Sequence, residues 1–396
     1  MLLRPQPDLF ELKEDEMPAH SDLIGGSSAE RIMSCTGSVA LSRQMPPQPQ
    51  SKYMSEGTML HSVMEKCLND EVEPWELIGY EENGITLTKD LVEELADPAL
   101  NSFRTIKPLY GDFVFETEAR VGYRDIDGFG TCDIIGFNER YTIILDWKFG
   151  RGVPVSAVNN HQLKFYAGAA RETPGLEDMF DRDRPMLLAI IQPAADEPVT
   201  MDFITHDELD EFVAEMKQAV ENVLNDTTDL VSGKWCRWCQ GAPICPVKKS
   251  LAEELISKDV RGVDRGELAS LIKLAKEAAD WSKSVMGFAH QELERGRDVE
   301  GYKLVAKRAT RSWKSDGEAE DLFNDFGFSG DMIKESKLIS PAQAEKLFKR
   351  NGHPIDALED LIRRVQVGTT MATAGDKRPA VTGKYEASNL ALPKRT

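Results

Sequence analysis

The chain has 396 residues, of which 41% are hydrophobic, so it is long enough to bury a full core in two or three structural units. It contains no run of about 18 apolar residues, and its acidic start lacks the basic and apolar regions of a signal peptide, so we expect a cytosolic protein without a membrane span. The net charge of -19 argues against coating of nucleic acid through overall charge, while leaving room for a local basic groove.

The first part of the chain is expected to be an arm followed by helices. Residues 1–26 are rich in Pro and acids and predict a flexible arm. A short helix-bearing segment that includes Cys35 follows over residues 27–45. Apolar residues at helical spacing then predict a helix over residues 54–68, which carries His61 and Glu65 one turn apart on one face.

Short strands separated by turn signals begin at residue 113. Three of them, at residues 113–122, 129–137 and 141–148, are close enough in sequence to form an antiparallel meander. A helix over residues 156–171 and an apolar strand over residues 186–192 follow. The order of helix, three strands, helix and strand predicts an α/β core.

The second half of the chain has a different character. A helix is predicted over residues 206–224, a group of cysteines follows it, and residues 247–294 have the pattern of two helices. Segment 301–314 is basic and strand-like, and short helices are expected up to residue 365. We therefore predict an arm, a core, a helical and basic accessory region and a disordered tail, at residues 1–26, 27–250, 251–368 and 369–396.

Two acids and a lysine interrupt apolar strands in the predicted core. Asp133 stands in the strand 129–137, and Asp146 and Lys148 end the strand 141–148. A buried carboxylate without a partner costs several kcal/mol, so such an Asp usually has an assigned partner. The period of two in a strand directs Asp146 and Lys148 to the same face, and pairing of the two strands brings Asp133 near Asp146.

This set suits phosphodiester hydrolysis. Two carboxylates can hold one or two Mg²⁺ or Mn²⁺ ions, which stabilise charge on the phosphate and lower the pKa of a bound water. Lys148 would orient that water and balance charge, and the carbonyl of Trp147 would be a further oxygen ligand. The alternative is that Asp133 caps a turn while Asp146 and Lys148 form an ordinary salt bridge.

Two pairs of helical residues extend the candidate site. His61, with Glu65 one turn later, would bring an imidazole to the metal, although a single His is more often a packed or capping residue. Gln162 and Tyr166 lie one turn apart on the helix after the Asp146 strand, where they would hydrogen-bond DNA backbone or order the site. Taken alone, they would be an ordinary polar helix face.

These four patterns together resemble the RecB-type branch of the PD-(D/E)XK nucleases over roughly residues 27 to 250. The family order is matched by Gly57 and His61, Gly130 and Asp133, Asp146 and Lys148, and Gln162 and Tyr166. The resemblance implies a restriction-endonuclease-like mixed sheet flanked by helices, metal binding at His61, Asp133 and Asp146, catalysis by Lys148, and DNA contact from Gln162 and Tyr166. Asp146 stands where many members carry Glu, which the family tolerates. With the segment 301–313, the layout also looks like a phage-associated nuclease family, which implies the cytoplasm of a bacterial host.

Six cysteines in a cytosolic chain are not expected to form disulfides, and three of them cluster. Cys236, Cys239 and Cys245 have the spacing of soft thiolate ligands for Zn²⁺ or an iron-sulfur cluster, and Gly241 and Pro243 provide a sharp loop. Spacing alone does not separate the two metals. Nucleases of the AddB and CRISPR-associated kinds resemble this layout, which implies Cys35 as the fourth ligand of a 4Fe-4S cluster with a structural role. Cys67 and Cys132 are expected to be buried thiols.

The segment 301–314 contains five basic residues and no acid. These are Lys303, Lys307, Arg308, Arg311 and Lys314, and Tyr302 and Trp313 are aromatic residues available to stack on a base. An exposed face with ordinary lysines is the equal alternative.

The preferred function is a metal-dependent DNA exonuclease. The resemblance favours action on free DNA ends and a role in phage-type recombination, repair or replication, with a recombination or single-strand-binding protein as partner. The alternative from another class is a non-catalytic DNA-binding or scaffold protein that retains the fold, and intact Asp133, Asp146 and Lys148 speak against it.

Overall fold

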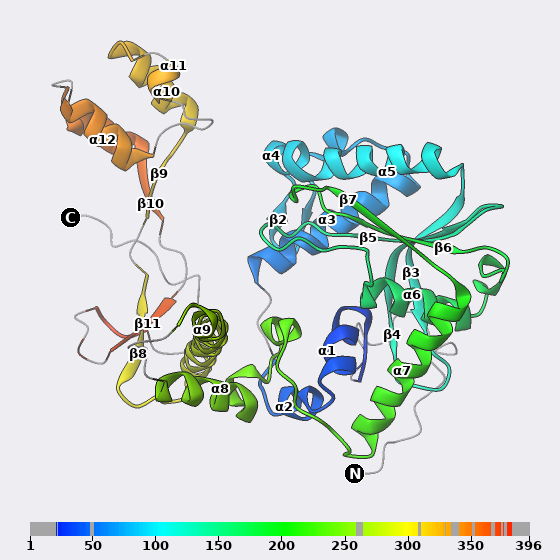
Figure 1. Ribbon diagram of the computed structural model, residues 1–396. Coiled ribbons are helices and arrows are strands. Elements are labelled where there is room, and N and C mark those ends of the chain that lie inside the picture. The colour runs from blue at the N-terminus through cyan, green and yellow to red at the C-terminus, as the bar shows by residue number, and fades with distance from the viewer. Residues whose placement is uncertain are drawn as a thin grey trace. The chain divides into compact units, whose positions relative to one another are not determined.

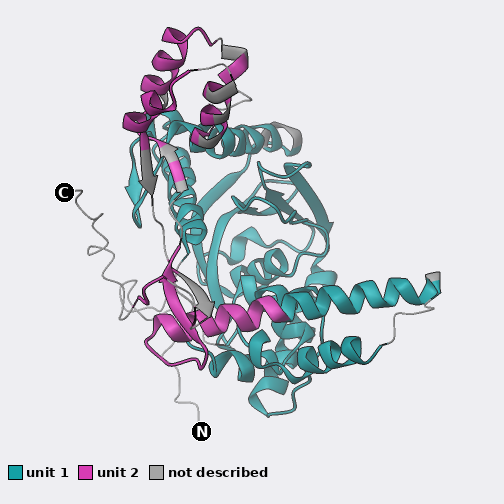
Figure 2. Ribbon diagram, turned by 90° about the vertical axis from the view of Figure 1, so that its left-hand side faces the viewer, with its two compact units in different colours: residues 1–281 teal, residues 282–396 magenta. Residues whose placement is uncertain are grey.

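The computed structural model describes residues 21, 23–47, 51–258, 264–307, 310–328, 330–333, 340–350, 353–365, 369–373, 375 and 378–381. The chain divides into two compact units, residues 1–281 and 282–396 (Figure 2). The division falls within helix α9 (Arg265–Glu294), further along the chain than the predicted boundary after residue 250. Among the described residues, no helix is both long and apolar enough to cross a bilayer.

The first unit is built on a five-stranded mixed sheet (Figure 1). Its strands are, in spatial order, β3 (Val114–Gly122), β4 (Phe129–Phe137), β5 (Thr142–Trp147), β6 (Met186–Ile191) and β7 (Val199–Ile204). All neighbours are antiparallel except β5 and β6, which run parallel. The predicted meander of three strands is therefore confirmed, and β7 is a strand that the sequence reading missed.

Helices cover both faces of this sheet (Figure 1). One face packs against α3 (Lys52–Asn69) and against the continuous run of α4 (Lys89–Leu91), the π-helix η4 (Val92–Ala96) and α5 (Asp97–Tyr110). The other face packs against α1 (Ala29–Ser34), α2 (Ser38–Arg43), α6 (His161–Glu172) and α7 (His206–Leu224). Shorter elements join them: η2 (Gly26–Ser28), η3 (Pro74–Leu77), β1 (Glu81–Glu82), β2 (Ile85–Thr86) and η5 (Glu177–Met179).

Helix α3 forms where the apolar spacing predicts it. The side chain of Ser51 caps its start by accepting a hydrogen bond from the Met54 N–H. Its apolar residues recur at helical spacing and are buried: Met59, Leu60, Val63, Met64 and Cys67. Burying each large side chain contributes on the order of 1.5–3 kcal/mol, so this stripe fixes which face of α3 meets the sheet and which face carries His61.

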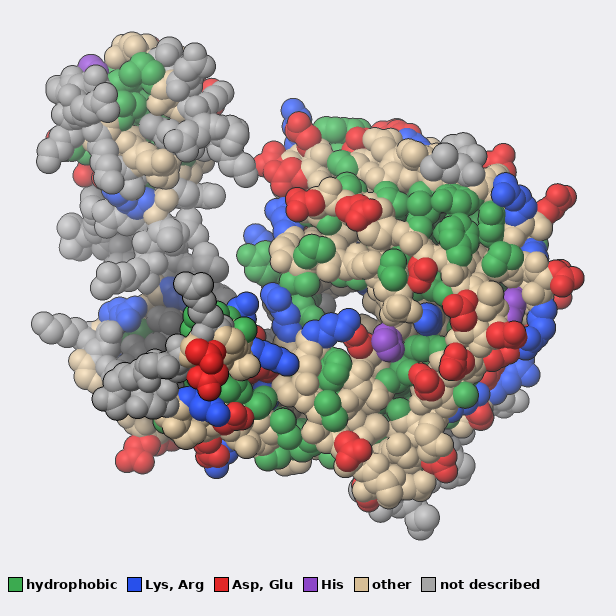
Figure 3. Space-filling view, viewed as in Figure 1, with side chains coloured by type: hydrophobic (Ala, Val, Ile, Leu, Met, Phe, Trp, Pro, Cys, Tyr) green, Lys and Arg blue, Asp and Glu red, His purple; other side chains and the backbone are tan. Residues whose placement is uncertain are grey.

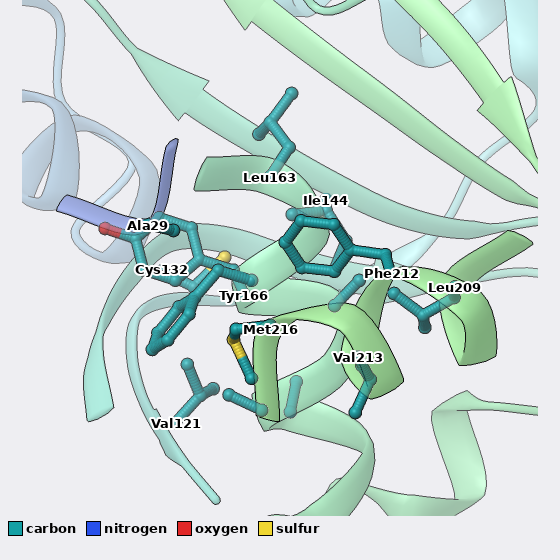
Figure 4. Packing of buried hydrophobic residues seen from close by; sticks show 14 of the residues in the cluster. Ala29, Val121, Cys132, Ile144, Leu163, Tyr166, Leu209, Phe212, Val213 and Met216 are labelled. Atoms are coloured by element: carbon teal, nitrogen blue, oxygen red, sulfur yellow. The ribbon is translucent and has the colours of Figure 1, made fainter. Parts of the chain in front are cut away.

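Helices α6 and α7 close the opposite core. A capping box between Thr205 and Glu208 starts α7, and its apolar stripe meets α6 and the sheet. Figure 4 shows Leu209, Phe212 and Met216 of α7 gathered with Ile144 of β5. Tyr166 of α6 lies at the edge of this cluster, near Ala29 and Cys132 (Figure 4).

The cysteine-bearing segment follows α7. It forms the short helices η6 (Lys234–Trp238) and η7 (Ala242–Ile244), and then α8 (Pro246–Ser257) and α9, which confirm the two helices predicted in residues 247–294. The middle of α9 is tied to this segment because the Trp281 indole N–H donates to the Pro243 carbonyl at 3.2 Å. The buried Lys248 ammonium also pairs with Glu277 of α9.

The second unit has its own small core. Strand β8 (Tyr302–Ala306) pairs with β11 (Thr369–Thr373), and β9 (Thr310–Trp313) pairs with β10 (Ile362–Val365). Helices α10 (Asp316–Asp325), α11 (Gly330–Ile333), α12 (Pro341–Arg350) and η8 (Ile355–Leu361) lie between β9 and β10 in the chain. The accessory region is thus mixed helix and strand. The range 369–396 is not wholly a tail, because β11 is paired along its whole length.

The predicted arm is also shorter than expected. Residues 1–20 and 22 lie outside the described residues. Leu23 and Ile24 are buried in the core of the first unit, and Ile24 forms a bridge to Gly128. Burial of these two apolar side chains anchors the chain before α1.

Candidate metal and nuclease site

Three carboxylates form a row across three neighbouring strands. The register puts Thr117 opposite Ile134 and Ala119 opposite Cys132, so Glu118 of β3 faces Asp133 of β4. Ile134 lies opposite Leu145, so the next facing pair is Asp133 with Asp146 of β5. The predicted closeness of the two strand acids agrees with this register, and Glu118 extends the row by one strand.

The row coincides with a change in the faces of β3 and β4. In a regular strand alternate side chains share a face. Phe115, however, packs with the α3 side of the sheet, whereas Ala119 packs with the α6 side. Glu118 lies between them in a left-handed conformation with φ +49°, which costs on the order of 1–3 kcal/mol for a non-glycine residue. This local twist lets the carboxylates meet side chains from helices on both faces.

His61 of α3 approaches the row from one face. Its Nδ1 is 3.2 Å from Asp133 Oδ1 and 3.7 Å from Glu118 Oε1. Burial lowers the pKa of His61, but the neighbouring Asp133, with Glu118 and Asp146, outweighs it and raises this pKa to about 10. The imidazole is therefore protonated at neutral pH when no cation neutralises the acids.

Asp146 is the most buried acid of the set, with 1% of its surface exposed. Burial raises its pKa to about 6, against the lowering effect of Lys148, whose Nζ is 2.5 Å from Asp146 Oδ2. That oxygen makes this ion pair but accepts no well-directed hydrogen bond. The Lys148 side chain remains 26% exposed, so its ammonium stands between the buried acid and solvent.

Gln162 and Tyr166 of α6 reach the row from the other face. The Gln162 amide Nε2 donates to Asp146 Oδ1 at 2.9 Å and to the Tyr166 hydroxyl at 3.0 Å. Tyr166 is only 7% exposed, and its ring fills the space left by two glycines: a Cβ on Gly26 would lie 2.7 Å from it, and one on Gly130 3.1 Å. Because Tyr166 is buried, it is better placed to order Asp146 through Gln162. The predicted contact of Tyr166 with DNA is disfavoured for the same reason.

Trp147 contributes through its backbone. Its N–H donates to Asp133 Oδ2 at 2.6 Å, and its side chain is buried on the α3 side of the sheet. The role of its carbonyl as a metal ligand stays a prediction.

A group of side chains that could hold a metal ion lies at one end of the row. His61, Glu118 and Asp133 each offer a ligand atom, and these atoms lie within 4.8 Å of one another. Imidazole nitrogen and carboxylate oxygen suit Mn²⁺, and carboxylate oxygen suits Mg²⁺. Glu65, one turn after His61, is not in this group, although its pKa is raised by burial and by Glu118.

The four predicted sulfur ligands line one cavity. Cys35 precedes the sheet in the chain, and Cys236, Cys239 and Cys245 follow it, with Leu41, Leu230 and Trp235 among the apolar neighbours. The Val231 N–H donates to Cys35 Sγ and the Gly233 N–H donates to Cys236 Sγ, both at 3.4 Å. Burial raises the pKa of Cys35 and of Cys239. Cys67 and Cys132 are buried elsewhere, as predicted.

The basic segment of the second unit is only partly available. Lys307 is exposed, Arg311 pairs with Glu345, and Arg308 lies outside the described residues. Tyr302 is 45% exposed, but Trp313 is buried in the core of this unit and is not free to stack on a base.

One sequence family covers nearly all of the described part of the chain. The chain belongs to the family described as "Protein of unknown function (DUF2800)", which matches residues 20–379. Among solved structures, the chain is similar to a "Putative exonuclease" from Eubacterium rectale, with 10% identity over 64% of this chain and 96% of that chain and a TM-score of 0.33. It is also similar to an alkaline exonuclease from Laribacter hongkongensis, with 9% identity over 54% of this chain and 98% of that chain and a TM-score of 0.22.

Proposed function

We propose that the protein is a divalent-metal-dependent DNA nuclease that hydrolyses phosphodiester bonds from free ends. The observation that carries this proposal is the convergence of Asp133, Asp146 and Lys148 on adjacent strands, with His61 added from α3. A structural salt bridge would account for Asp146 and Lys148, but it would not account for two more carboxylates and an imidazole beside them.

The residues present fit a divalent cation. Asp146 is a buried acid with one oxygen that accepts no well-directed hydrogen bond, and the ligand atoms of Glu118, Asp133 and His61 lie within 4.8 Å of one another. Three neighbouring carboxylates repel one another, and a divalent cation would add to the charge compensation that Lys148 and His61 already give. Asp133 and Asp146 would hold Mg²⁺ or Mn²⁺, with His61, Glu118 and the Trp147 carbonyl as further ligands. The cation would supply charge stabilisation at the phosphate and a water of lowered pKa.

The side chains around the acids have separate tasks. Lys148 carries the positive charge nearest to solvent, so it would orient the attacking water and balance charge at the scissile phosphate. Gln162 holds Asp146 Oδ1, and Tyr166 holds Gln162, so this pair would keep the carboxylate in one orientation. The Trp147 N–H does the same for Asp133.

We also propose that Cys35, Cys236, Cys239 and Cys245 bind a 4Fe-4S cluster with a structural role. The Val231 and Gly233 N–H groups point at two of these sulfurs and would stabilise them as metal-bound thiolates. One of the four cysteines precedes the sheet in the chain and three follow it, so a cluster held by all four would tie these two segments together. A single Zn²⁺ on the same four thiolates is the alternative.

The proposal extends to the biological role of the protein. We propose action on DNA ends in phage-type recombination, repair or replication. A recombination or single-strand-binding protein would be its partner. The exposed Lys307 would add a phosphate contact, and the predicted contacts of Arg308 and Arg311 would join it if Arg311 exchanged Glu345 for a phosphate.

The decisive experiment is digestion of end-labelled linear DNA and closed circular DNA with Mg²⁺ or Mn²⁺, by wild type and by Asp146→Ala purified anaerobically. Metal-dependent loss of linear DNA with wild type alone is the expected result. If the wild type also cut closed circular DNA, the proposal of cleavage from free ends would be wrong and internal cleavage would take its place. Binding without cleavage in every condition would favour a non-catalytic DNA-binding scaffold.

A further inference from the structure

Between the start of α3 and His61, the helix face that carries His61 has no charged side chain. Met54, Gly57, Thr58 and His61 recur at spacings of three, four and seven residues, so they lie along one side of the helix. None of the three residues before His61 on this side is charged, in a chain whose net charge is -19. A polyanion approaching His61 from the start of α3 therefore meets no acid of this face before it reaches His61.

The beginning of this face exposes large apolar side chains. Tyr53, which borders it, is 85% exposed, and Met54 is 56% exposed. With a rise of 1.5 Å per residue, Tyr53 lies about 12 Å along the helix axis from His61. An aromatic ring left in water this close to a proposed metal site is suited to stacking on a ligand.

Gly57 lies between the two ends of the face and has no packing reason to be glycine. A Cβ there would meet nothing within 4 Å, and its φ is not in the left-handed region. Glycine within a helix lowers the stability of that helix. What glycine provides is a bare stretch of backbone, one turn before His61, against which another chain can lie closely.

We infer that this α3 face, defined by Tyr53, Met54, Gly57 and Thr58, binds the single strand of DNA that leads into the metal site. Tyr53 stacks on an unpaired base, and the sugar-phosphate backbone passes over Gly57. A duplex does not offer the face of a base in mid-stack, whereas every unpaired base does, so the surface selects single strands without selecting sequence. The proposal rests on the nuclease function proposed above and specifies its substrate as a single-stranded end.

The test measures binding separately from cleavage. In an Asp146→Asn background, fluorescence anisotropy is recorded with a labelled twelve-nucleotide oligothymidine and with a blunt duplex of the same length. Tyr53→Ala is expected to weaken binding of the single strand by about tenfold and to leave duplex binding unchanged, while Tyr53→Phe keeps the wild-type affinity. Trp75→Ala, which removes an exposed aromatic side chain elsewhere in the same unit, is the matched control and is expected to change neither.

Gly57→Ala provides a second test, in which stability and single-strand binding are expected to change in opposite directions. It is expected to raise the melting temperature, because alanine favours the helix, while weakening single-strand binding. A more stable variant with unchanged binding would overturn the role of Gly57, and equal losses for single strand and duplex in Tyr53→Ala would overturn the single-strand assignment. Tyr53-dependent binding without any cleavage by wild type would contradict the nuclease and support the α3 face. Cleavage that depends on Asp146, with binding indifferent to Tyr53, would overturn the α3 face alone.

Discussion

Asp133 accepts a hydrogen bond from the backbone N–H of Trp147 at 2.6 Å, so the acid of one strand is held by the residue next to the acid of the neighbouring strand. This bond adds a side-chain contact to the ordinary pairing of β4 with β5. The separation of Asp133 from Asp146 is thereby set by backbone geometry, which is the kind of preorganisation that metal sites need.

Asp146→Asn is expected to abolish cleavage while stabilising the metal-free protein. The amide cannot replace a carboxylate ligand, so we expect a loss of activity on the order of 10³-fold. The substitution also removes a buried negative charge that folding must desolvate. At pH values above 6, where Asp146 is ionised, the metal-free variant should therefore melt at a higher temperature than the metal-free wild type. Activity is followed on linear DNA and stability by calorimetry. Cleavage within tenfold of wild type would contradict the assigned site.

The stabilising effect of Mn²⁺ is expected to grow with pH. Burial raises the pKa of Asp146 to about 6 from an unfolded value of about 3.9, so the metal-free protein loses stability as pH rises through this window. The neighbouring acids raise the pKa of His61 to about 10, so the stability that this group adds is lost only above neutral pH. A bound cation requires ionised carboxylates and a neutral imidazole. The shift in melting temperature on adding Mn²⁺ should be larger at pH 8 than at pH 5; equal shifts would speak against these ligands.

Glu118→Gln tests the acid that the sequence reading missed. Loss of a carboxylate from the group with His61 and Asp133 should weaken Mn²⁺ binding by about tenfold or more, measured by titration calorimetry. Glu116→Gln is the matched control, because Glu116 lies two residues away in the same strand and is exposed. If both variants bind Mn²⁺ like wild type, Glu118 is not a ligand.

Cys239→Ser is expected to bleach and destabilise the protein. The cluster proposed at this cavity would link a residue before the sheet to three residues after it, so losing one ligand should release iron and lower the melting temperature. Cys67→Ala is the control, because burial raises the pKa of that thiol to about 11 and its sulfur lies on α3 away from the cavity. It should keep the iron content. A Cys239→Ser protein as stable as wild type, with no metal in either, would refute the cluster.

Gly26→Ala is expected to destabilise the first unit by about 1–3 kcal/mol. A Cβ at this position would come within 2.7 Å of the Tyr166 ring, which is already buried and hydrogen-bonded through Gln162 to Asp146. Gly150→Ala, where a Cβ would meet nothing within 4 Å, is the control and should be nearly neutral. Both are measured by urea unfolding. Equal stability of the two variants would mean that the Tyr166 ring has room to move.

The parts of the site that the sequence predicted are those with a local signal. An acid in an apolar strand identified Asp133 and Asp146, and helical spacing identified α3 with His61. Glu118 carries no comparable signal, because it alternates with Glu116 in a half-exposed strand and its role depends on a left-handed backbone. The burial of Tyr166 depends on glycines distant in the chain, which no local pattern reveals.

The elements that the sequence reading missed have weak patterns for physical reasons. Strand β7 is an edge strand whose residues are mostly half-buried, so its hydrophobic pattern is faint. Helix α5 contains Pro98 and Pro108, which ordinarily argue against a helix interior. Its apolar residues Ala99, Leu100, Phe103 and Ile106 nevertheless pack on the sheet, so tertiary burial outweighs local preference.

Asp146 is the next-to-last residue of β5, the central strand of the sheet, which has two strands on either side. Backbone amides in such a strand exchange with solvent only when the whole cooperative unit opens, whereas edge strands and loops open on their own. Fraying of the edge strand β7 would thus leave this carboxylate in position. On heating, the ability to cleave and the native fold should disappear together, without an intermediate range of temperature in which a folded protein has already lost its acids.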